Sequence, residues 1–322
     1  MTVETHIRLF STDEISSLGS GLSRPECVLA TPSGDLFTPD WTLGIARIAP
    51  DGGVSAAVEA PLIEEGFLPN GVAIAPEGGF LFANLGEKGG VWHVGSTGRA
   101  QPFLLEVGEY RIPPANFVLV DGRRIWITVS ASTRSHEYFT KDEDSGVIIL
   151  FEGGRARIVA DGLTWTNELR VSPDGRHLFV NETFACRTTR FDLEADGSLG
   201  ARTHVEFPAG TFPDGLAFDE TGCLWTVCPV SNRILRIAPD LSWEIVFEDC
   251  DPAFFNQMSE AYSKGRLTRD MIVQSKGSRV SNLSSIAFGG RDRKTIYLGA
   301  LTTASISCLP APVAGAALDH WA

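Results

Sequence analysis

The sequence predicts an all-β fold, a six-bladed β-propeller, and three observations support this prediction. A polar or small residue followed by a short apolar run occurs six times along the 322 residues. Most copies are followed by a Pro/Asp-Gly turn and a second apolar run. Successive copies are 44 to 70 residues apart, and they start at Glu26, Asn70, Asn116, Asn167, Asp214 and Ser284. Repeats of about 40–50 residues with strands between turns are typical of propeller blades.

Each repeat is expected to form an inner strand, a turn and then further strands of one blade. The runs that follow the inner strands are rich in β-branched and aromatic residues, which pleated strands favour. Six blades account for nearly the whole chain, so one domain over residues 1–322 is expected. The expected later strands are 35–37 and 44–48 in blade 1, 80–83 and 90–94 in blade 2, 124–129 and 146–151 in blade 3, 186–192 in blade 4, 232–237 in blade 5, and 295–299 and 305–309 in blade 6.

Two stretches depart from the repeat. Residues 130–145 are polar and too long for a plain connection, and they either cover the mouth of the central tunnel or form an exposed excursion. Residues 249–279 show partial helical spacing after Asp251-Pro252, a plausible helix start. We expect one short helix there, laid on the outside of the propeller.

The ring must also close. Residues 6–10 alternate between polar and apolar side chains. We therefore expect an N-terminal strand at this position to pair with the last blade, because a closed ring hides its sheet edges.

Composition excludes several classes of function. The net charge of −13 argues against nucleic-acid binding. No apolar run approaches the length of a membrane span, and the N-terminus has no signal-peptide pattern. None of the six cysteines forms a CxxC pair, so reduced buried thiols in a cytoplasmic protein are expected. None of the six histidines lies in the repeat register, which disfavours a His-based triad or zinc site. The sequence does not indicate an oligomeric state.

We call the six residues at which the repeats start the registered residues, and we expect them to carry the chemistry. In a closed ring they should meet at one end of the tunnel, where they offer two carboxylates and several amide oxygens. Such hard oxygen ligands suit a divalent cation. An alternative interpretation is that Asn70-Gly71 and Asp214-Gly215 are simply turn formers.

The chain resembles a known family at motifs spread over its whole length. These motifs are Arg24-Pro25-Glu26, Trp165-Thr166-Asn167-Glu168, Val171-Ser172-Pro173-Asp174-Gly175, Phe212-Pro213-Asp214-Gly215-Leu216-Ala217-Phe218-Asp219, Ser285-Ile286-Ala287-Phe288-Gly289-Gly290 and Lys294-Thr295-Ile296-Tyr297. The resemblance is to the senescence marker protein/gluconolactonase/luciferin-regenerating enzyme family.

This resemblance implies a six-bladed propeller lactonase with one divalent cation. It implies that Glu26, Asn167 and Asp214 bind the cation and that Asn116 lies beside the metal or on the substrate. Ca²⁺ is favoured, with Zn²⁺, Mn²⁺, Mg²⁺ and Fe²⁺ as other candidates.

Two departures from the family pattern concern the substrate. Thr166-Asn167-Glu168 stands where sugar lactonases often have Ser-Asn-Gly, and Pro114-Ala115-Asn116-Phe117 stands where they often have Arg-x-Asn-Asp. Arg111 is near the missing arginine but out of register. Together with Asn116, Arg111 and Glu168 are candidate substrate contacts. The apolar Phe117 favours a more apolar lactone or ester than an aldonolactone.

The expected reaction is metal-assisted opening of a small-molecule lactone. Asp214 is the candidate general base, and Asn116 would orient the water or the substrate carbonyl. One alternative is phosphotriester or aryl-ester cleavage at the same metal site. Another is a propeller that binds a ligand without catalysis.

Overall fold

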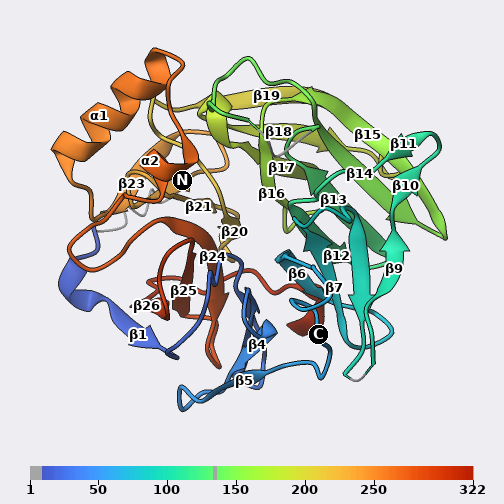
Figure 1. Cartoon of the computed structure of the whole chain (residues 1–322). Helices are drawn as coiled ribbons and strands as arrows, with labels where there is room; N and C mark the ends of the chain where they lie inside the picture. Colours follow the sequence, from blue (N-terminus) through green and yellow to red (C-terminus); the bar gives the residue numbers. More distant parts are fainter. Residues whose placement is uncertain (1–8, 97, 133–135, 322) are drawn as a thin grey trace.

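Six four-stranded antiparallel sheets surround a central axis in the computed structural model, which describes residues 9–96, 98–132 and 136–321 (Figure 1). The strands of each sheet follow chain order, except in the last sheet. A hairpin of β10 (Glu106–Val107) and β11 (Tyr110–Arg111) extends at the periphery. The predicted six-bladed β-propeller is confirmed.

The first three blades are formed by residues 29–163. Their strands are β2 (Leu29–Ala30), β3 (Leu36–Asp40), β4 (Gly44–Ile48) and β5 (Val54–Ala56), then β6 (Pro69–Ile74), β7 (Phe80–Asn84), β8 (Val91–Val94) and β9 (Gln101–Leu104), then β12 (Phe117–Asp121), β13 (Arg124–Val129), β14 (Gly146–Glu152) and β15 (Arg155–Leu163).

The other three blades use the rest of the chain and one early strand. Their strands are β16 (Thr166–Val171), β17 (His177–Glu182), β18 (Arg187–Leu193) and β19 (Leu199–Glu206), then β20 (Leu216–Phe218), β21 (Leu224–Cys228), β22 (Arg233–Ile237) and β23 (Trp243–Glu248), then β24 (Leu283–Gly289), β25 (Thr295–Ala300), β26 (Ile306–Pro310) and β1 (Ser16–Leu18).

The ring closes through β1, which pairs antiparallel with β26. Closure by an early strand is confirmed, but its predicted position at residues 6–10 is wrong. Residues 6–8 lie outside the described residues, and Leu9 and Phe10 are not in a strand. Phe10 is buried against Trp225 of blade 5, and its N–H donates to the Val246 carbonyl at 2.8 Å. Burial of this aromatic ring fixes the segment beside blade 5, and the chain reaches blade 6 only after the short helix η1 (Thr12–Glu14).

The hydrophobic core lies between neighbouring blades. For example, Trp225 of blade 5 packs at 5.6 Å against Phe288 of blade 6, and both are buried. Each sheet therefore buries both faces against its neighbours, and its stability depends on the closed ring.

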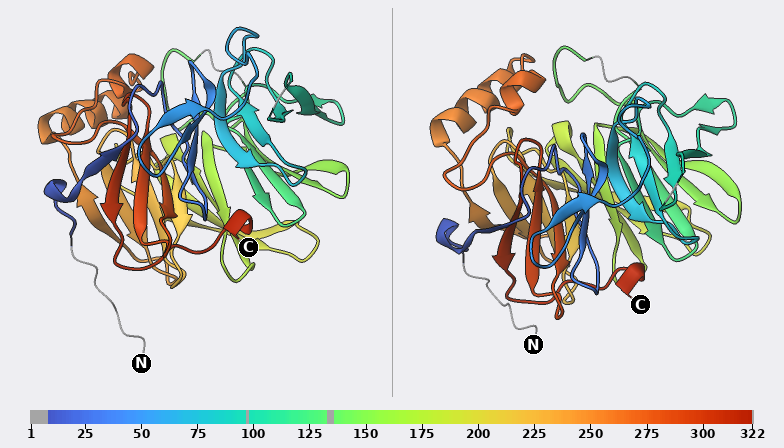
Figure 2. Two further views of the ribbon diagram at one scale, coloured as in Figure 1. Left: turned by 90° about the horizontal axis from the view of Figure 1, so that it is seen from below. Right: turned by 60° about the horizontal axis from the view of Figure 1, so that its bottom comes forward.

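Residues 249–279 differ from the expectation of one outer helix. They contain α1 (Pro252–Ser263) and α2 (Arg269–Ile272), and Figure 2 shows both helices at one end of the propeller, with the C-terminus at the opposite end. Their apolar faces are buried over that end because Met258, Leu267 and Ile272 pack with aromatic residues of blades 3–5. We call residues 136–145 and 252–280 together the cap.

Residues 136–145 of the polar stretch belong to this cap. Phe139 is buried, and its N–H donates to the Leu267 carbonyl at 2.8 Å. The position of this stretch, which the sequence left open, is therefore over the mouth of the tunnel for its described part.

Asp249 holds together the two ends of the helical part of the cap. Its carboxylate accepts hydrogen bonds from the N–H groups of Ser278, Arg279 and Val280 at 2.7–2.9 Å. Burial of Asp249 opposes ionisation, but these donors outweigh it and lower its pKa.

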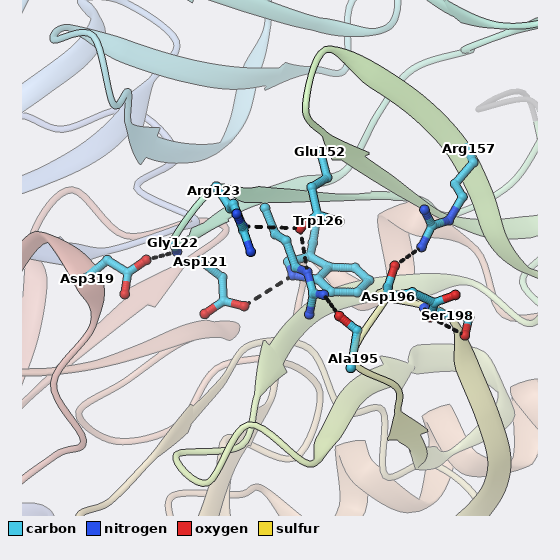
Figure 3. A network of polar contacts seen from close by, with 11 residues as sticks. Asp121, Gly122, Arg123, Trp126, Glu152, Arg157, Ala195, Asp196, Ser198 and Asp319 are labelled. Carbon is cyan, nitrogen blue, oxygen red and sulfur yellow. Dashed lines mark hydrogen bonds and ion pairs between the residues drawn. The ribbon is translucent and has the colours of Figure 1, made fainter.

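Polar contacts stabilise the end of the propeller opposite the cap (Figure 3). Asp319 near the C-terminus accepts from the Gly122 N–H in blade 3. Arg124 bonds Glu152 at 3.2 Å and the Ala195 carbonyl of blade 4 at 2.5 Å. The C-terminal segment and blades 3 and 4 are thus linked outside the sheets. Within the described part of the chain, no helix combines the length and apolar character needed to cross a membrane.

Ring closure can be tested by removing residues 1–18. This deletion removes β1 and Phe10 and leaves β26 as an unpaired edge, and exposed strand edges promote aggregation. We expect lower Tm and aggregation on size-exclusion chromatography. Ser17→Ala, at an exposed position of β1, should behave like the full chain. A truncated protein with the elution volume and Tm of the full chain would contradict the closure.

Candidate metal and active site

The inner strands approach one another so closely that two glycines are required. A Cβ on Gly71 would lie 2.6 Å from the Cα of Phe117, and one on Gly215 would lie 2.5 Å from the Cα of Ser285. Neither glycine has a positive φ. Close backbone contact, and not a turn, therefore explains why Gly follows Asn70 and Asp214.

A residue with strained backbone precedes the registered residue in three repeats. Arg24, Trp165 and Asn282 have φ of 58°, 54° and 50°, a left-handed conformation that non-glycine residues rarely adopt. Each stands two positions before its registered residue. The backbone thus enters the inner strand in the same way at blades 1, 4 and 6.

Four of the predicted site residues line one cavity at the capped end of the tunnel. They are Glu26, Asn116, Asn167 and Asp214, and the cavity volume is about 120 Å³. All but the half-buried Asn167 are buried. The repeat register therefore brings together the residues that the sequence singled out.

The other two registered residues support Glu26. Asn70 Nδ2 donates to Glu26 Oε1 at 3.2 Å and to the Asn116 carbonyl at 3.0 Å. Ser284 Oγ donates to the Glu26 carbonyl at 3.0 Å. These bonds fix the side chain and the backbone of Glu26 at the tunnel end.

Hydrogen bonds also orient Asn167 and Asp214. Asn167 Nδ2 donates to Thr183 Oγ1 at 3.2 Å, and that hydroxyl donates to the Pro213 carbonyl at 2.8 Å. The amide oxygen of Asn167 is thus on the side away from Thr183. Asn181 Nδ2 donates to the Asp214 carbonyl at 2.8 Å. Contacts from the short helix η2 (Thr183–Ala185) and from β17 thus hold Asn167 and Asp214.

The electrostatics of the cavity favour a cation. Burial, followed by the negative charges of Glu26 and Glu168, raises the pKa of Asp214 well above its ordinary value. Among the described residues, Asn116 Oδ1 and Asp214 Oδ1 are buried and have no hydrogen-bond partner. A divalent cation would compensate both the repulsion and the unpaired oxygens.

The donor set fits a hard cation. It consists of carboxylate and amide oxygens, as Ca²⁺ and Mg²⁺ prefer. In the described ranges no three His, Cys, Asp or Glu side chains are grouped to hold a metal ion. Binding here would therefore need the amide oxygen of Asn167 in addition to Glu26 and Asp214.

Two of the predicted substrate contacts do not line the cavity. Arg111 is exposed in β11, and Glu168 is buried among other residues. Glu168 Oε1 accepts from Ser285 Oγ at 2.8 Å, and its other oxygen pairs with Arg170 at 3.2 Å. Burial raises the pKa of Glu168 to about 7, although Arg170 and Ser285 oppose the shift. Neither Arg111 nor Glu168 is among the residues that line the cavity.

Phe117 also lies elsewhere. It stacks against the Arg170 guanidinium at 4.9 Å and borders a second cavity nearer the C-terminal segment. Phe117 therefore does not line the cavity, and the prediction of an apolar substrate from this residue was wrong. Apolar walls come instead from the cap and blades 4 and 5, through Phe139, Trp165, Phe184, Phe212 and Ile272.

The sequence did not reveal two arginines that line the cavity, Arg24 and Arg269. Arg24 forms an ion pair with Glu26 and stacks on Trp41 at 4.5 Å. Arg269 extends from the cap. The position of Arg24 two residues before Glu26 was a usable signal, but nothing in the repeat register indicated Arg269.

A comparison with known protein families identifies the family of this chain. Residues 24–245 match the family described as SMP-30/Gluconolactonase/LRE-like region. The chain belongs to this family. The expected resemblance is thereby confirmed over most of the sequence.

Two curated relatives have low sequence identity to this chain. The chain is 26% identical over 162 residues to a 6-deoxy-6-sulfogluconolactonase of Pseudomonas putida, covering 49% of this chain and 46% of the relative. It is 28% identical over 112 residues to human serum paraoxonase/arylesterase 1, covering 30% and 31%. The chain thus spans less than half the length of these curated relatives.

Solved structures share the fold. A gluconolactonase of Xanthomonas campestris has a TM-score of 0.67 at 17% identity, covering 92% of this chain and 89% of its own. A calcium-binding regucalcin of Agrobacterium tumefaciens has a TM-score of 0.59 at 14% identity, covering 96% and 95%. At these identities the likeness shows a common six-bladed architecture.

The close approach of the inner strands predicts the effect of Gly215→Ala. The added Cβ would meet the Ser285 backbone, so the strand carrying Asp214 must shift. We expect the free energy of unfolding to fall by about 1–3 kcal/mol, measured by urea denaturation. The control is Gly200→Ala, where a Cβ comes no closer than 3.4 Å to its neighbours. Stability equal to wild type in Gly215→Ala would contradict the contact.

Proposed function

We propose that this chain is a divalent-metal-dependent lactonase. The observation that carries the proposal is the meeting of two carboxylates and two amides in one buried cavity, with unpaired oxygens on Asn116 and Asp214. Membership of the gluconolactonase-like family and the lactonase activity named for the P. putida relative support it.

Glu26, Asn167 and Asp214 would hold the cation. When bound, it would polarise the lactone carbonyl and acidify a water molecule. Ca²⁺ is the first choice because every donor is an oxygen, and the regucalcin described as calcium-binding supports it. Zn²⁺, Mn²⁺, Mg²⁺ and Fe²⁺ are the other candidates.

The side chains of Asn116 and Asp214 have different roles in the proposed reaction. Asn116, whose Nδ2 and Oδ1 offer a donor and an acceptor, orients the substrate carbonyl or the water. The unpaired Oδ1 of Asp214 accepts a proton from the attacking water. The water oxygen bonds to the carbonyl carbon, the ring C–O bond breaks, and the ring oxygen takes up the proton that Asp214 accepted. The product is a hydroxy acid.

The cavity walls select the substrate. Phe139, Trp165, Phe184 and Phe212 exclude water from the reacting ring and present few partners for hydroxyl groups. We therefore propose a lactone whose ring is more apolar than that of an aldonolactone. Ester hydrolysis at the same site is a second candidate, favoured by the similarity to the paraoxonase/arylesterase.

Metal binding can be tested with Asp214→Asn, which keeps the shape of the side chain but removes its charge. We expect wild type to bind one Ca²⁺ per chain in a calorimetric titration and the variant to bind at least ~10-fold more weakly, because a single carboxylate, Glu26, remains. Asp240→Asn, at an exposed surface carboxylate, should bind as wild type does. Equal affinity in wild type and Asp214→Asn would remove Asp214 from the site.

The substrate class can be tested by comparing two lactones with the same metal. Unpaired buried polar groups cost about 1–3 kcal/mol each, and the aromatic walls offer little hydrogen bonding to a sugar ring. We expect kcat/KM for an alkyl or aryl lactone to be at least comparable with that for gluconolactone. A preference for gluconolactone of ~100-fold or more would show that polar groups of the cavity serve the sugar hydroxyls.

A further inference from the structure

One cation in the cavity lining has no role in the proposed reaction. Arg269 begins α2 in the cap, and part of its side chain is exposed. Its guanidinium lies over the Phe139 ring at 5.2 Å. Among the residues that the structure describes, no carboxylate forms an ion pair with it within 4.0 Å.

Arg24, the other arginine in the cavity lining, differs from Arg269 because it has a carboxylate partner. Its charge is matched by Glu26, and its guanidinium stacks on Trp41. Desolvation, and then the positive charge of Arg24, lowers the pKa of Arg269. The charges of Glu26 and Asp270 act in the opposite direction but do not outweigh these two effects. Among the described residues, Arg269 therefore has no carboxylate paired with it as Glu26 is paired with Arg24.

The position of Arg269 in the cavity can be compared with the net charge of the whole chain. The chain carries a net charge of −13, so a second arginine in this cavity does not follow from a generally basic surface. Inside the cavity, Arg24 and Arg269 balance Glu26 and Asp214. A divalent cation would make the lining net positive and would leave the charge of Arg269 available for a ligand.

We propose that the natural lactone carries an anionic group, a carboxylate or a sulfonate, which Arg269 binds at the mouth of the cavity. The inference rests on the proposed function and specifies its substrate class. The ring lies at the floor between Glu26 and Asp214, an apolar linker follows the aromatic walls, and the acid group reaches the cap. A guanidinium suits this task because its planar fork can donate two parallel hydrogen bonds to such an anion.

The proposal is tested with a matched pair of lactones. One has a side chain that ends in a carboxylate, and the other has the corresponding neutral methyl ester. We expect wild type to show at least ~10-fold higher kcat/KM for the acid at low ionic strength, where charge pairing is least screened. Arg269→Met keeps an unbranched apolar side chain against Phe139 and should lose this preference, because kcat/KM for the acid should fall ~10-fold more than kcat/KM for the ester.

A control variant separates charge at the cavity from charge on the cap. Arg266 is exposed on the same part of the chain and does not line the cavity. Arg266→Met should keep the preference of wild type. If Arg269 only held the cap in place, Arg269→Met would reduce hydrolysis of both lactones equally, and that result would overturn the proposal, as would equal rates for acid and ester in wild type.

Binding distinguishes this inference from the lactonase proposal itself. Tetrahydrofuran analogues lack the ring carbonyl, so they measure affinity without turnover. Calorimetry should show tighter binding of the carboxylate or sulfonate analogue than of the methyl ester in wild type, and no difference in Arg269→Met. This result supports the anion site even if no lactone is hydrolysed, and the tighter of the two acids identifies the anionic group. No preference for either acid over the ester in wild type would overturn it.

Discussion

The close approach of the inner strands around the axis is the constraint on which the site depends. Gly71 and Gly215 have no room for a Cβ because neighbouring inner strands touch them. This contact brings residues far apart in the sequence to one end of the tunnel, where Glu26, Asn167 and Asp214 share a cavity. The rest of each blade holds its inner strand in place through burial between neighbouring sheets, and closure by β1 completes the ring.

The arrangement of the tunnel end concentrates negative charge in a buried place. Carboxylates that repel one another under desolvation oppose folding unless something compensates them. Arg24 compensates Glu26 within the protein, but Asp214 has no such partner among the described ion pairs, and its pKa is raised. A bound cation at this point would therefore stabilise the fold as well as supply chemistry, which links stability to metal binding.

The repeat made much of this architecture predictable. Six registered positions predicted the number of blades and four of the polar residues of the cavity, because equivalent positions of a closed ring must meet. The cap could not be read in the same way, since it lies outside the repeat and its position depends on the burial of Phe139 and Met258 against blades 3–5. Arg269 was missed for this reason. Phe117 and Arg111 were misplaced because sequence neighbours of a site residue alternate in direction along a strand or leave it for a peripheral hairpin.

We propose that Glu26, Asn167 and Asp214 bind one divalent cation at the capped end of the tunnel. Anomalous diffraction from crystals grown with Mn²⁺, an oxygen-seeking cation with a measurable signal, can locate this cation. We expect one strong peak per chain within about 2.0–2.6 Å of the side-chain oxygens of these three residues. A fully occupied Mn²⁺ site elsewhere on the protein, with no peak among these oxygens, would contradict it.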